Sequence, residues 1–340
     1  MRQTGVRRSI VAAVIATTAW SAVSCSLLFD RSGDAKHLDQ QIHGMPGVAD
    51  TDVDYKSDFT SGERFDLTVM LRPDVTDQQV SDIGRAFVDV TNKTGLSERS
   101  AELALRYPIN PPPPTSNYTT DYSDTLFSAG SQSVRDNPTA DEVAASAATW
   151  LRAARSPAAI GVQLVQPLWS QPGDSRQITV TLRPGATSAD AIALQASDPG
   201  LAGASWGISV IGDEMYRPHD YYSTPTPPTD AELDLWRRVS ALVGVSQGAR
   251  GQTTVPAERG KQAETWFEIY LPDGAGSEPD ARRIAYGVAR LVLRFDHPVQ
   301  LTLYTGDGTA ELVVGGCYQH DAKHQVQPLE ADLSTAFEKC

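Results

Sequence analysis

Apolar and polar residues alternate strictly along three stretches of the chain, FDLTVML (65–71), RQITVTL (176–182) and TWFEIYL (265–271). A period of two with β-branched and aromatic residues is typical of a strand that buries one of its faces. A proline follows each stretch, at Pro73, Pro184 and Pro272. Because proline cannot donate a hydrogen bond to a neighbouring strand, it ends the strand there. The pattern therefore predicts three half-buried strands with defined C-terminal ends.

A helical pattern comes after each of these strands. Apolar residues repeat with the spacing i, i+3, i+7, i+10 at Val80, Ile83, Phe87 and Val90, and again at Ile284, Val288, Leu291 and Phe295. The stretch SADAIALQA (188–196) shows the same pattern more weakly. A further alternating stretch then follows each helix: ELALRY (102–107), WGISVI (206–211) and VQLTLY (299–304). The chain therefore contains three predicted β-α-β units.

Capping boxes mark the predicted helix starts, because each places a hydroxyl three residues before an acid or amide that can satisfy two orphan N–H groups reciprocally. They are Thr76-x-x-Gln79, Thr139-x-x-Glu142 and Thr229-x-x-Glu232. The last two predict further helices over 139–155 and 229–244, and IGVQLV (160–165) predicts another strand.

The order of these elements is β-α-β-β-α-β if a short extra strand precedes the second helix of each unit. This is the order of a ferredoxin-like unit, in which helices cover one face of an antiparallel sheet. The sequence therefore predicts the α+β class, with tandem ferredoxin-like units at 59–168, 172–257 and 262–340. The third unit has no evident fourth strand in residues 329–340.

One phrase occurs twice. TVMLRPDVTDQQV (68–80) returns 111 positions later as TVTLRPGATSADAI (179–192). Each copy predicts a strand with one buried face, a proline that ends the strand and a cap that begins the next helix. We therefore interpret the repeat as a duplicated building unit. Arg72 and Arg183 stand at equivalent strand ends. Solvated strand termini are the simpler interpretation of this pair, and a functional pair is the alternative.

Composition and charge narrow the function classes. Apolar residues make up 40% of the 340 residues, which is enough to form a core, and the formal charge is −13. Residues 1–24 hold Arg2, Arg7 and Arg8 and no acid, so the remaining chain carries −16. A nucleic-acid-binding protein would show a basic stripe, so that class is not supported.

The N-terminus has the features of an export signal. MRQTGVRR is a basic flank, SIVAAVIATTAWSAVS is an apolar core that ends in small residues, and Cys25 follows. Ala22-Val23-Ser24-Cys25 resembles the lipobox of bacterial lipoproteins, although leucine is usual where Ala22 stands. The resemblance implies a signal peptide over 1–24 and diacylglyceryl attachment to Cys25, with palmitate-like chains that hold the protein on the outer face of the cell membrane. The apolar run 10–29 leaves an uncleaved signal anchor as an alternative, and plain secretion is a second one.

The N-terminal 30 residues and the excess of 23 arginines over 6 lysines resemble an envelope lipoprotein of actinobacterial, mycobacterial-like type. This resemblance implies a compartment and no activity. If Cys25 is lipidated, Cys317 and Cys340 remain as an even pair in an oxidising space, and we expect them to form a disulfide.

Three segments are expected to lie outside the hydrophobic core. Residues 25–58 form the expected lipid attachment and polar tether, since they show few large apolar groups and no sustained period. NPPPPTSNYTTDYSD (110–124) and YRPHDYYSTPTPPTD (216–230) are expected loops between a unit's second strand and its second helix. They either pack tyrosine rings on the sheet or act as aromatic recognition loops.

Few motifs in the sequence could form a catalytic or metal-binding site. Gly244-Val245-Ser246-Gln247-Gly248 has the letters of a serine-hydrolase elbow, but a predicted helix precedes Ser246 where the elbow needs a strand. His320 and His324 are weak metal candidates beside Cys317. The aspartates of Asp50-x-Asp52-x-Asp54 lack the glycine and glutamate of a calcium loop.

No other motif supports a cofactor, because no nucleotide-binding loop occurs. Asp124, Asp136, Asp141 and Glu142 cannot be paired into an acid–base dyad from the sequence. Four tryptophans are expected to pack in the core, with an aromatic ligand platform as the alternative: Trp150, Trp206, Trp236 and Trp266.

The sequence therefore favours a membrane-anchored extracytoplasmic lipoprotein that binds an envelope protein or a small ligand, as an accessory or scaffold module, with no catalytic residues assigned. The alternative is an envelope hydrolase whose site is assembled from residues distant in sequence. A third interpretation, a structural spacer of the envelope, would need a surface without a pocket.

Overall fold

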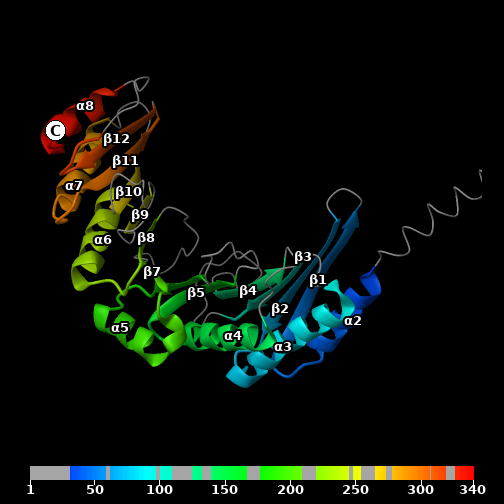
Figure 1. The fold of residues 1–340 in the computed structure, drawn as a ribbon. Helices are drawn as coiled ribbons and strands as arrows, with labels where there is room; N and C mark the ends of the chain where they lie inside the picture. Colours follow the sequence, from blue (N-terminus) through cyan, green and yellow to red (C-terminus); the bar gives the residue numbers. More distant parts are fainter. Residues whose placement is uncertain are drawn as a thin grey trace, which may run out of the picture. The chain divides into compact units, whose positions relative to one another are not determined.

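The structure is a computed structural model, and Figure 1 shows its elements in chain order. It describes residues 31–58, 62–96, 100–108, 125–131, 139–166, 177–208, 220–244, 248–253, 265–272, 278–306, 308–318 and 326–340. These residues form two compact units. The first is made from those within 31–105, 128–145 and residue 166, and the second from those within 106–127, 146–165 and 176–340. The boundaries between the two units fall inside three strands and one helix.

The fold is α+β, as the sequence predicts. The described helices are α2 Ser32–His43, α3 Asp77–Thr94, α4 Ala140–Ala154, α5 Ser188–Ser197, α6 Asp230–Val243, α7 Glu278–Val292 and α8 Pro328–Phe337, with a 3₁₀ turn η2 at Pro199–Leu201. The described strands are β1 Val48–Asp58, β2 Gly62–Leu71, β3 Ser100–Arg106, β4 Thr125–Ser131, β5 Ala159–Gln166, β6 Gln177–Leu182, β7 Ser205–Ile208, β8 Asp220–Thr224, β9 Ala249–Thr253, β10 Thr265–Tyr270, β11 Val299–Thr305 and β12 Gly308–Val314.

The first unit corrects the expected polar tether over 25–58. Within the described part of that range, α2 buries Ala35, Leu38 and Ile42 against β1 and β2. β1 then pairs antiparallel with β2 along almost its whole length. The prediction of a tether was wrong for two reasons. β1 joins the sheet through backbone hydrogen bonds, which do not require apolar side chains. Three spaced apolar residues are enough to pack a short helix against the sheet.

In the second unit, the strands follow chain order from β5 to β12. β6 and β7 are parallel, as are β8 and β9, and β10 and β11. Antiparallel pairs alternate with these: β5 with β6, β7 with β8, β9 with β10, and β11 with β12. The sheet is therefore mixed.

This strand order corrects the expected antiparallel, ferredoxin-like sheets. The expected short strand before the second helix is present, as β4 and β8, so the chain order is right. A ferredoxin-like unit, however, splits its β-α-β strands with a third strand between them. Here β6 and β7 are direct neighbours. The chain is therefore a repeated α-β-β element, in which each helix from α2 to α7 is followed by two strands.

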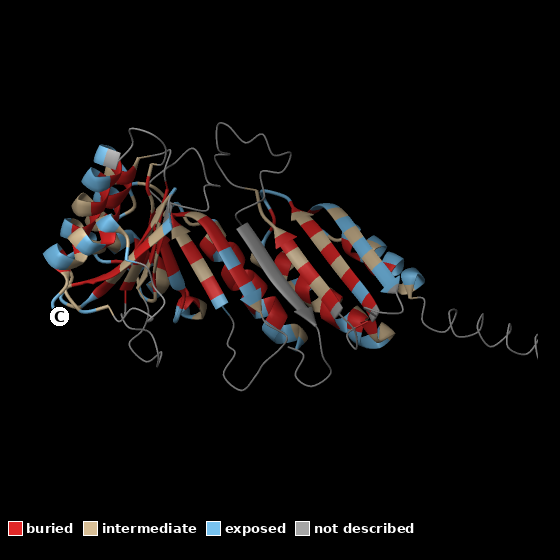
Figure 2. Cartoon of the chain, turned by 90° about the horizontal axis from the view of Figure 1, so that it is seen from above, coloured by how far each residue is buried: buried red, intermediate tan, exposed pale blue. Residues whose placement is uncertain are grey.

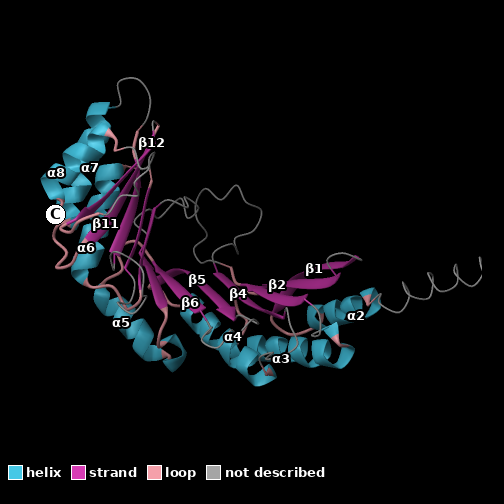
Figure 3. Ribbon diagram, turned by 45° about the horizontal axis from the view of Figure 1, so that its top comes forward, coloured by secondary structure: helices cyan, strands magenta, loops and turns pink. Residues whose placement is uncertain are grey.

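Helices cover one face of the sheet in each unit. Figure 3 shows α2 and α3 on one side of β1 and β2, and α5 to α8 on one side of β6 to β12. The strand residues that face the helices are buried, and the alternate residues are half-buried, which gives the banded strands of Figure 2. The predicted core positions are confirmed as Phe65, Leu67, Val69, Leu71, Ile178, Val180, Leu182, Phe267, Ile269 and Leu271.

The predicted helix caps are present. Thr76 Oγ1 accepts from Gln79 N at 3.2 Å, and Gln79 Oε1 accepts from Thr76 N at 2.8 Å. Equivalent reciprocal bonds join Thr139 to Glu142 and Thr229 to Glu232. Because these bonds satisfy orphan N–H groups, they fix where α3, α4 and α6 begin.

Candidate functional site

Several sequence-predicted site residues fall outside the described part of the chain: Cys25, Ser246, His320 and His324. Across the described ranges, no group of three metal-ligating side chains comes together, and no helix has the length and apolarity needed to cross a membrane. Lipidation of Cys25 and a metal role for the two histidines therefore stay predictions.

Cys317 and Cys340 form the expected disulfide, with an S–S distance of 2.06 Å. It lies beside backbone contacts that also hold the C-terminus. Gly315 N donates to Phe337 O at 2.9 Å, and Lys339 N donates to Gly316 O at 2.7 Å. Glu338 lies between them, and its Oε1 accepts from Val313 N of β12 at 2.8 Å. The disulfide thus closes a C-terminal segment that is also held by hydrogen bonds.

The aspartates at 50, 52 and 54 lie on β1 and not in a loop. They are exposed, and β1 continues through all three of them in its pairing with β2. Lys56 Nζ forms an ion pair with Asp54 Oδ2 at 2.5 Å. An extended strand spreads these carboxylates apart, so the structure agrees with the sequence in giving no calcium loop.

The tryptophans divide between the core and the opposite face of the sheet. Trp150, Trp206 and Trp236 are fully buried, as expected for core packing. Trp236 stacks on Tyr222 with ring centroids 5.6 Å apart. Trp266 is half-buried and alternates with the core residues of β10. Three of the four thus pack in the core, and a ligand-binding platform made from all four is not formed.

A hydroxyl–histidine–aspartate array is assembled from residues distant in sequence. Thr265 Oγ1 lies 2.8 Å from His297 Nε2, and His297 Nδ1 lies 2.9 Å from Asp296 Oδ1. The array continues through Thr253 Oγ1, 3.0 Å from Thr265 Oγ1, to Tyr222 Oη at 2.6 Å. Burial raises the pKa of the Tyr222 hydroxyl, which therefore stays protonated. The hydrogen bond from His297 lowers the pKa of Asp296, which therefore stays ionised.

This array resembles a catalytic triad in connectivity only. Thr265 has 0% of its surface exposed and shares the helix-covered face of β10 with Phe267. A nucleophile must reach a substrate carbonyl, and a fully buried hydroxyl cannot do so. The array satisfies polar groups between β8, β9 and β10 and fixes the turn before β11.

The duplicated arginines have a shared structural role. Arg72 Nε donates to Val48 O at 3.0 Å, and Arg72 N donates to Gly47 O at 2.8 Å. In the second copy, Arg183 Nη2 donates to Ala159 O at 3.1 Å, and Arg183 N donates to Ala158 O at 2.8 Å. Each arginine therefore ties the end of one strand to the start of its hairpin partner. This finding favours the interpretation of the repeat as a duplicated building unit.

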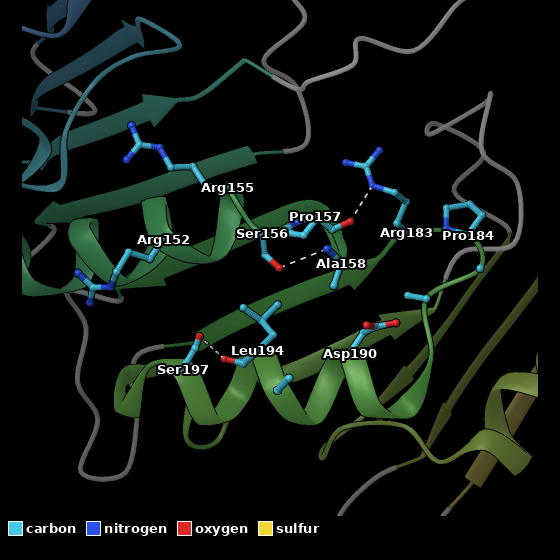
Figure 4. Close-up of a pocket in the computed structure, with 13 residues that line it drawn as sticks. Arg152, Arg155, Ser156, Pro157, Ala158, Arg183, Pro184, Asp190, Leu194 and Ser197 are labelled. Carbon is cyan, nitrogen blue, oxygen red and sulfur yellow. Dashed lines mark hydrogen bonds between the residues drawn. The ribbon is translucent and has the colours of Figure 1, made fainter.

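A hollow of about 600 Å³ opens at this point in the second copy, entirely within the second unit. Figure 4 shows it between the end of α4, the turn at 156–158, the end of β6 and one face of α5. The lining residues are Arg152, Arg155, Ser156, Pro157, Ala158, Arg183, Pro184, Gly185, Ala186, Asp190, Ala193, Leu194 and Ser197. Its volume falls in the range of small-molecule sites.

The charged groups of the hollow differ in how they are held. Arg152 is paired with the buried Asp198, whose Oδ2 accepts from Arg152 Nε at 2.8 Å. Arg155 lies over the ring of Tyr107, 5.6 Å from its centroid. Arg183 donates from Nε to Pro157 O at 3.1 Å as well as to Ala159 O, and it makes no ion pair with any described residue. Arg183 therefore places in the lining a guanidinium group that no described carboxylate compensates.

The other polar groups of the lining are occupied locally. Asp190 Oδ2 accepts from Thr187 N at 2.8 Å in the cap of α5. Ser197 donates to Leu194 O at 2.7 Å, and Ser156 Oγ accepts from Ala158 N at 3.2 Å. No hydroxyl of this lining is paired with a histidine base. Chemically, the hollow is equipped to bind and orient an anion and not to activate a nucleophile.

Comparison with known proteins adds no relative. No protein-family model matches the chain, and no curated protein or solved structure matches it. The sequence patterns missed Arg152 and Arg155 because each is a single exposed arginine near a helix end. Alignment of the two copies of the repeat would have shown both as differences between the copies.

Proposed function

We propose that this chain is a lipid-anchored protein of the outer face of the cell membrane that acts by binding, as an accessory or scaffold module of the envelope. The anchor is supported by the basic flank, the apolar core and Cys25 of the N-terminal sequence. The disulfide between Cys317 and Cys340 fits an oxidising compartment.

The observation that carries the binding role is the hollow of the second unit. It has the size of a ligand site, and its lining combines arginines with an apolar floor. It holds no pair of nucleophile and base. This combination supports a protein that retains a ligand and does not transform it.

The alternative function, an envelope hydrolase, is favoured by the Thr265–His297–Asp296 array. The binding role is preferred because Thr265 is fully buried and lies outside the lining of the hollow. Hydrolysis of a phosphate or carboxylate ester that is lost in a His297→Ala variant, with the fold retained, would reverse this preference.

We also propose that the chain is a tandem repeat whose units share the β-α-β-β-α-β chain order of ferredoxin-like proteins, at 59–168, 172–257 and 262–340. The matched arginine contacts of Arg72 and Arg183 support a duplication of at least the first two units. The sheet order described above belongs to this chain and not to the ferredoxin-like arrangement.

Fractionation of intact cells tests the anchor. Changing Cys25 to Ser is expected to release the protein from membrane fractions or to block its maturation, whereas a matched Ser26→Ala variant stays membrane-bound. Tight membrane association of the Cys25→Ser protein would contradict lipidation and favour the uncleaved anchor. Crosslinking in cells that express the unaltered protein then identifies its envelope neighbours.

A further inference from the structure

The hairpins β1–β2, β5–β6 and β9–β10 share one backbone contact. In each hairpin, a residue at the end of the second strand donates its N–H to the carbonyl of the residue that precedes the first strand. The donor and acceptor pairs are Arg72 and Gly47 at 2.8 Å, Arg183 and Ala158 at 2.8 Å, and Tyr270 and Gly248 at 3.1 Å. β1, β5 and β9 therefore hold the same place in the repeat, so β5 and β9 serve as references for β1.

The outer edges of β9 and β1 differ. β8 runs parallel to β9 along its outer edge, with Tyr222 opposite Gly251 and Ser223 opposite Gln252. Among the described strands, β1 has β2 as its one neighbour. β1 is 11 residues long, which is about twice the usual length of a strand. Because an edge strand presents a row of backbone groups to which another strand can pair, the outer edge of β1 is a candidate interaction surface.

Thr51, Val53 and Tyr55 turn their backbone groups to this edge. Thr51 N donates to Asp50 Oδ1 at 2.9 Å, so this N–H points away from β2. Successive residues of an antiparallel strand alternate in direction, so the N–H and C=O groups of Val53 and Tyr55 point to the same side. The outer edge therefore offers backbone donors and acceptors at every second residue.

The side chains that β1 turns toward the helices are less covered than their equivalents in the second copy. Thr51 and Val53 are half-buried. At an offset of 111 positions, Val162 and Leu164 of β5 have 0% of their surface exposed. α2 packs against β1 on this side, as Figure 3 shows. An apolar residue of an added strand would therefore lie beside Val53 and complete the cover that β5 already has.

The opposite face of β1 is acidic where the second copy is uncharged. Asp50, Asp52 and Asp54 are exposed on this face. With Lys56 they form a row with a formal charge of −2. The equivalents of the three aspartates in β5 are Gly161, Gln163 and Val165. The acidic row is therefore a property of the edge strand and not of the repeat.

The three aspartates differ in how their charge is compensated. Lys56 Nζ pairs with Asp54 Oδ2 at 2.5 Å, and His43 Nδ1 lies 4.0 Å from Asp50 Oδ1. The carboxylate of Asp52, at the centre of the row, makes no hydrogen bond or ion pair within the described ranges. Side chains on neighbouring strands approach to about 5 Å between Cβ atoms, so an added strand would place a side chain next to this carboxylate. A second copy of β1 would oppose aspartate to aspartate there, which is unfavourable.

We propose that the outer edge of β1 binds an extended segment of a partner protein in which lysine or arginine alternates with apolar residues. The backbone of the segment pairs with Thr51, Val53 and Tyr55. Its basic side chains face the aspartate row, and its apolar side chains lie on the α2 side beside Val53. This division of side chains is the same for parallel and antiparallel addition, because side chains alternate in both.

The assignment rests on the proposed binding role, since it specifies the kind of protein that an accessory module of the envelope would bind. It is independent of the hollow, because β1 belongs to the first unit and the hollow to the second. Charged residues on an edge strand also protect it from aggregation. A purely protective row would exclude strands of either charge, whereas the proposed row selects basic ones.

Calorimetric titration of the full chain with a synthetic peptide tests the selection. The peptide has about eight residues, to match an ordinary strand, and alternates lysine with valine; a matched peptide alternates glutamate with valine. The lysine peptide is expected to bind at least about tenfold more tightly than the glutamate peptide. Asp52→Lys is expected to reverse this preference, because the substitution inverts the charge at the centre of the row. Asp89→Lys makes the same change at an exposed position of α3 and is expected to leave both affinities unchanged.

Hydrogen exchange tests strand addition itself. In the free chain, the amides of Val53 and Tyr55 are expected to exchange rapidly, because they face the outer edge. Saturation with the lysine peptide is expected to slow both by at least about tenfold, since they then donate to the peptide backbone. The amides of β2 are the control, because they are expected to be protected with and without peptide.

Three outcomes would overturn the proposal: equal affinity for the two peptides, no binding of either peptide by a chain whose circular dichroism shows an intact fold, or peptide binding without protection of Val53 and Tyr55. Sedimentation that shows a dimer of the full chain, dissociated by Asp52→Lys, would assign the edge to a second copy and also overturn it. None of these results would alter the Cys25-dependent anchor or the hollow. Failure of the anchor, in turn, would not change the titration.

Discussion

Replacement of both Cys317 and Cys340 by serine tests how the C-terminus is held. The disulfide joins residues 23 positions apart. Closing a loop of that size in the unfolded chain is worth about 3 kcal/mol in the chain-entropy model. We therefore expect the free energy of unfolding to fall by about 3 kcal/mol.

The same structure predicts that α8 stays in place without the disulfide. Leu333 and Phe337 are buried, and the Phe337 ring meets the edge of Tyr286 with centroids 5.7 Å apart. Arg282 forms an ion pair with Asp332 of α8. Because these contacts belong to the folded state, the loss of stability acts mainly through the unfolded chain.

Urea denaturation and native-state hydrogen exchange separate the two effects. The serine variant is expected to show a lower midpoint, with the amides of Gly315 and Lys339 still protected by their backbone acceptors. Phe337→Ala is the matched control, since it keeps the disulfide but removes buried packing. An unchanged midpoint would refute the loop-closure argument. Amides that exchange as fast as in an unfolded peptide would show that the disulfide alone holds α8.

Three further substitutions test other parts of the fold. Ile42→Ala is expected to lower the free energy of unfolding by about 2–5 kcal/mol, because the side chain is fully buried in α2; a tether would show no change in a urea titration. Thr76→Ala removes the cap of α3 and is expected to cost about 1 kcal/mol, measured in the same way, and a cost near zero would mean that the capping bonds are dispensable. Asp198→Asn tests an electrostatic contribution. In the wild-type protein, burial acts to raise the pKa of Asp198, but hydrogen bonds from Gly200 N and Arg152 hold that pKa below its usual range. The folded pKa lies below the unfolded one, so the stabilisation is present above about pH 4 and is lost as the pH falls through the folded pKa. The wild-type advantage over this variant, about 1–3 kcal/mol at pH 7, is expected to shrink at pH 3; an equal advantage at both pH values would contradict the electrostatic explanation.

Local patterns were enough to predict the strands and helices with a clear apolar face. Phe65 to Leu71 and Phe267 to Leu271 are buried at the predicted alternate positions because the period of a strand is short-range information. The capping boxes were predictable for the same reason. β1 was missed, since its edge position allows Asp50, Asp52 and Asp54 to remain exposed while the backbone pairs with β2.

Strand order in the sheet could not be read from these patterns. The alternation in β6 and β7 is the same whether the two strands are neighbours or are separated by a third strand, because only one face of each is specified. The hollow was missed for a different reason. It depends on the size of side chains such as Ala186 relative to Val75, which becomes visible only when the two copies are placed side by side.

The sequential strand order has a consequence for how such a chain is made and changed. Within the second unit, each strand finds its partner either across a hairpin or across a single helix. Contacts are therefore short in sequence, which favours rapid folding from local nuclei. An α-β-β element can pair with its predecessor as soon as it is complete, so the sheet is able to grow from the N-terminal side while the rest of the chain is still unfolded. A chain of this kind can also gain or lose whole elements at an end without rearranging the strands already paired.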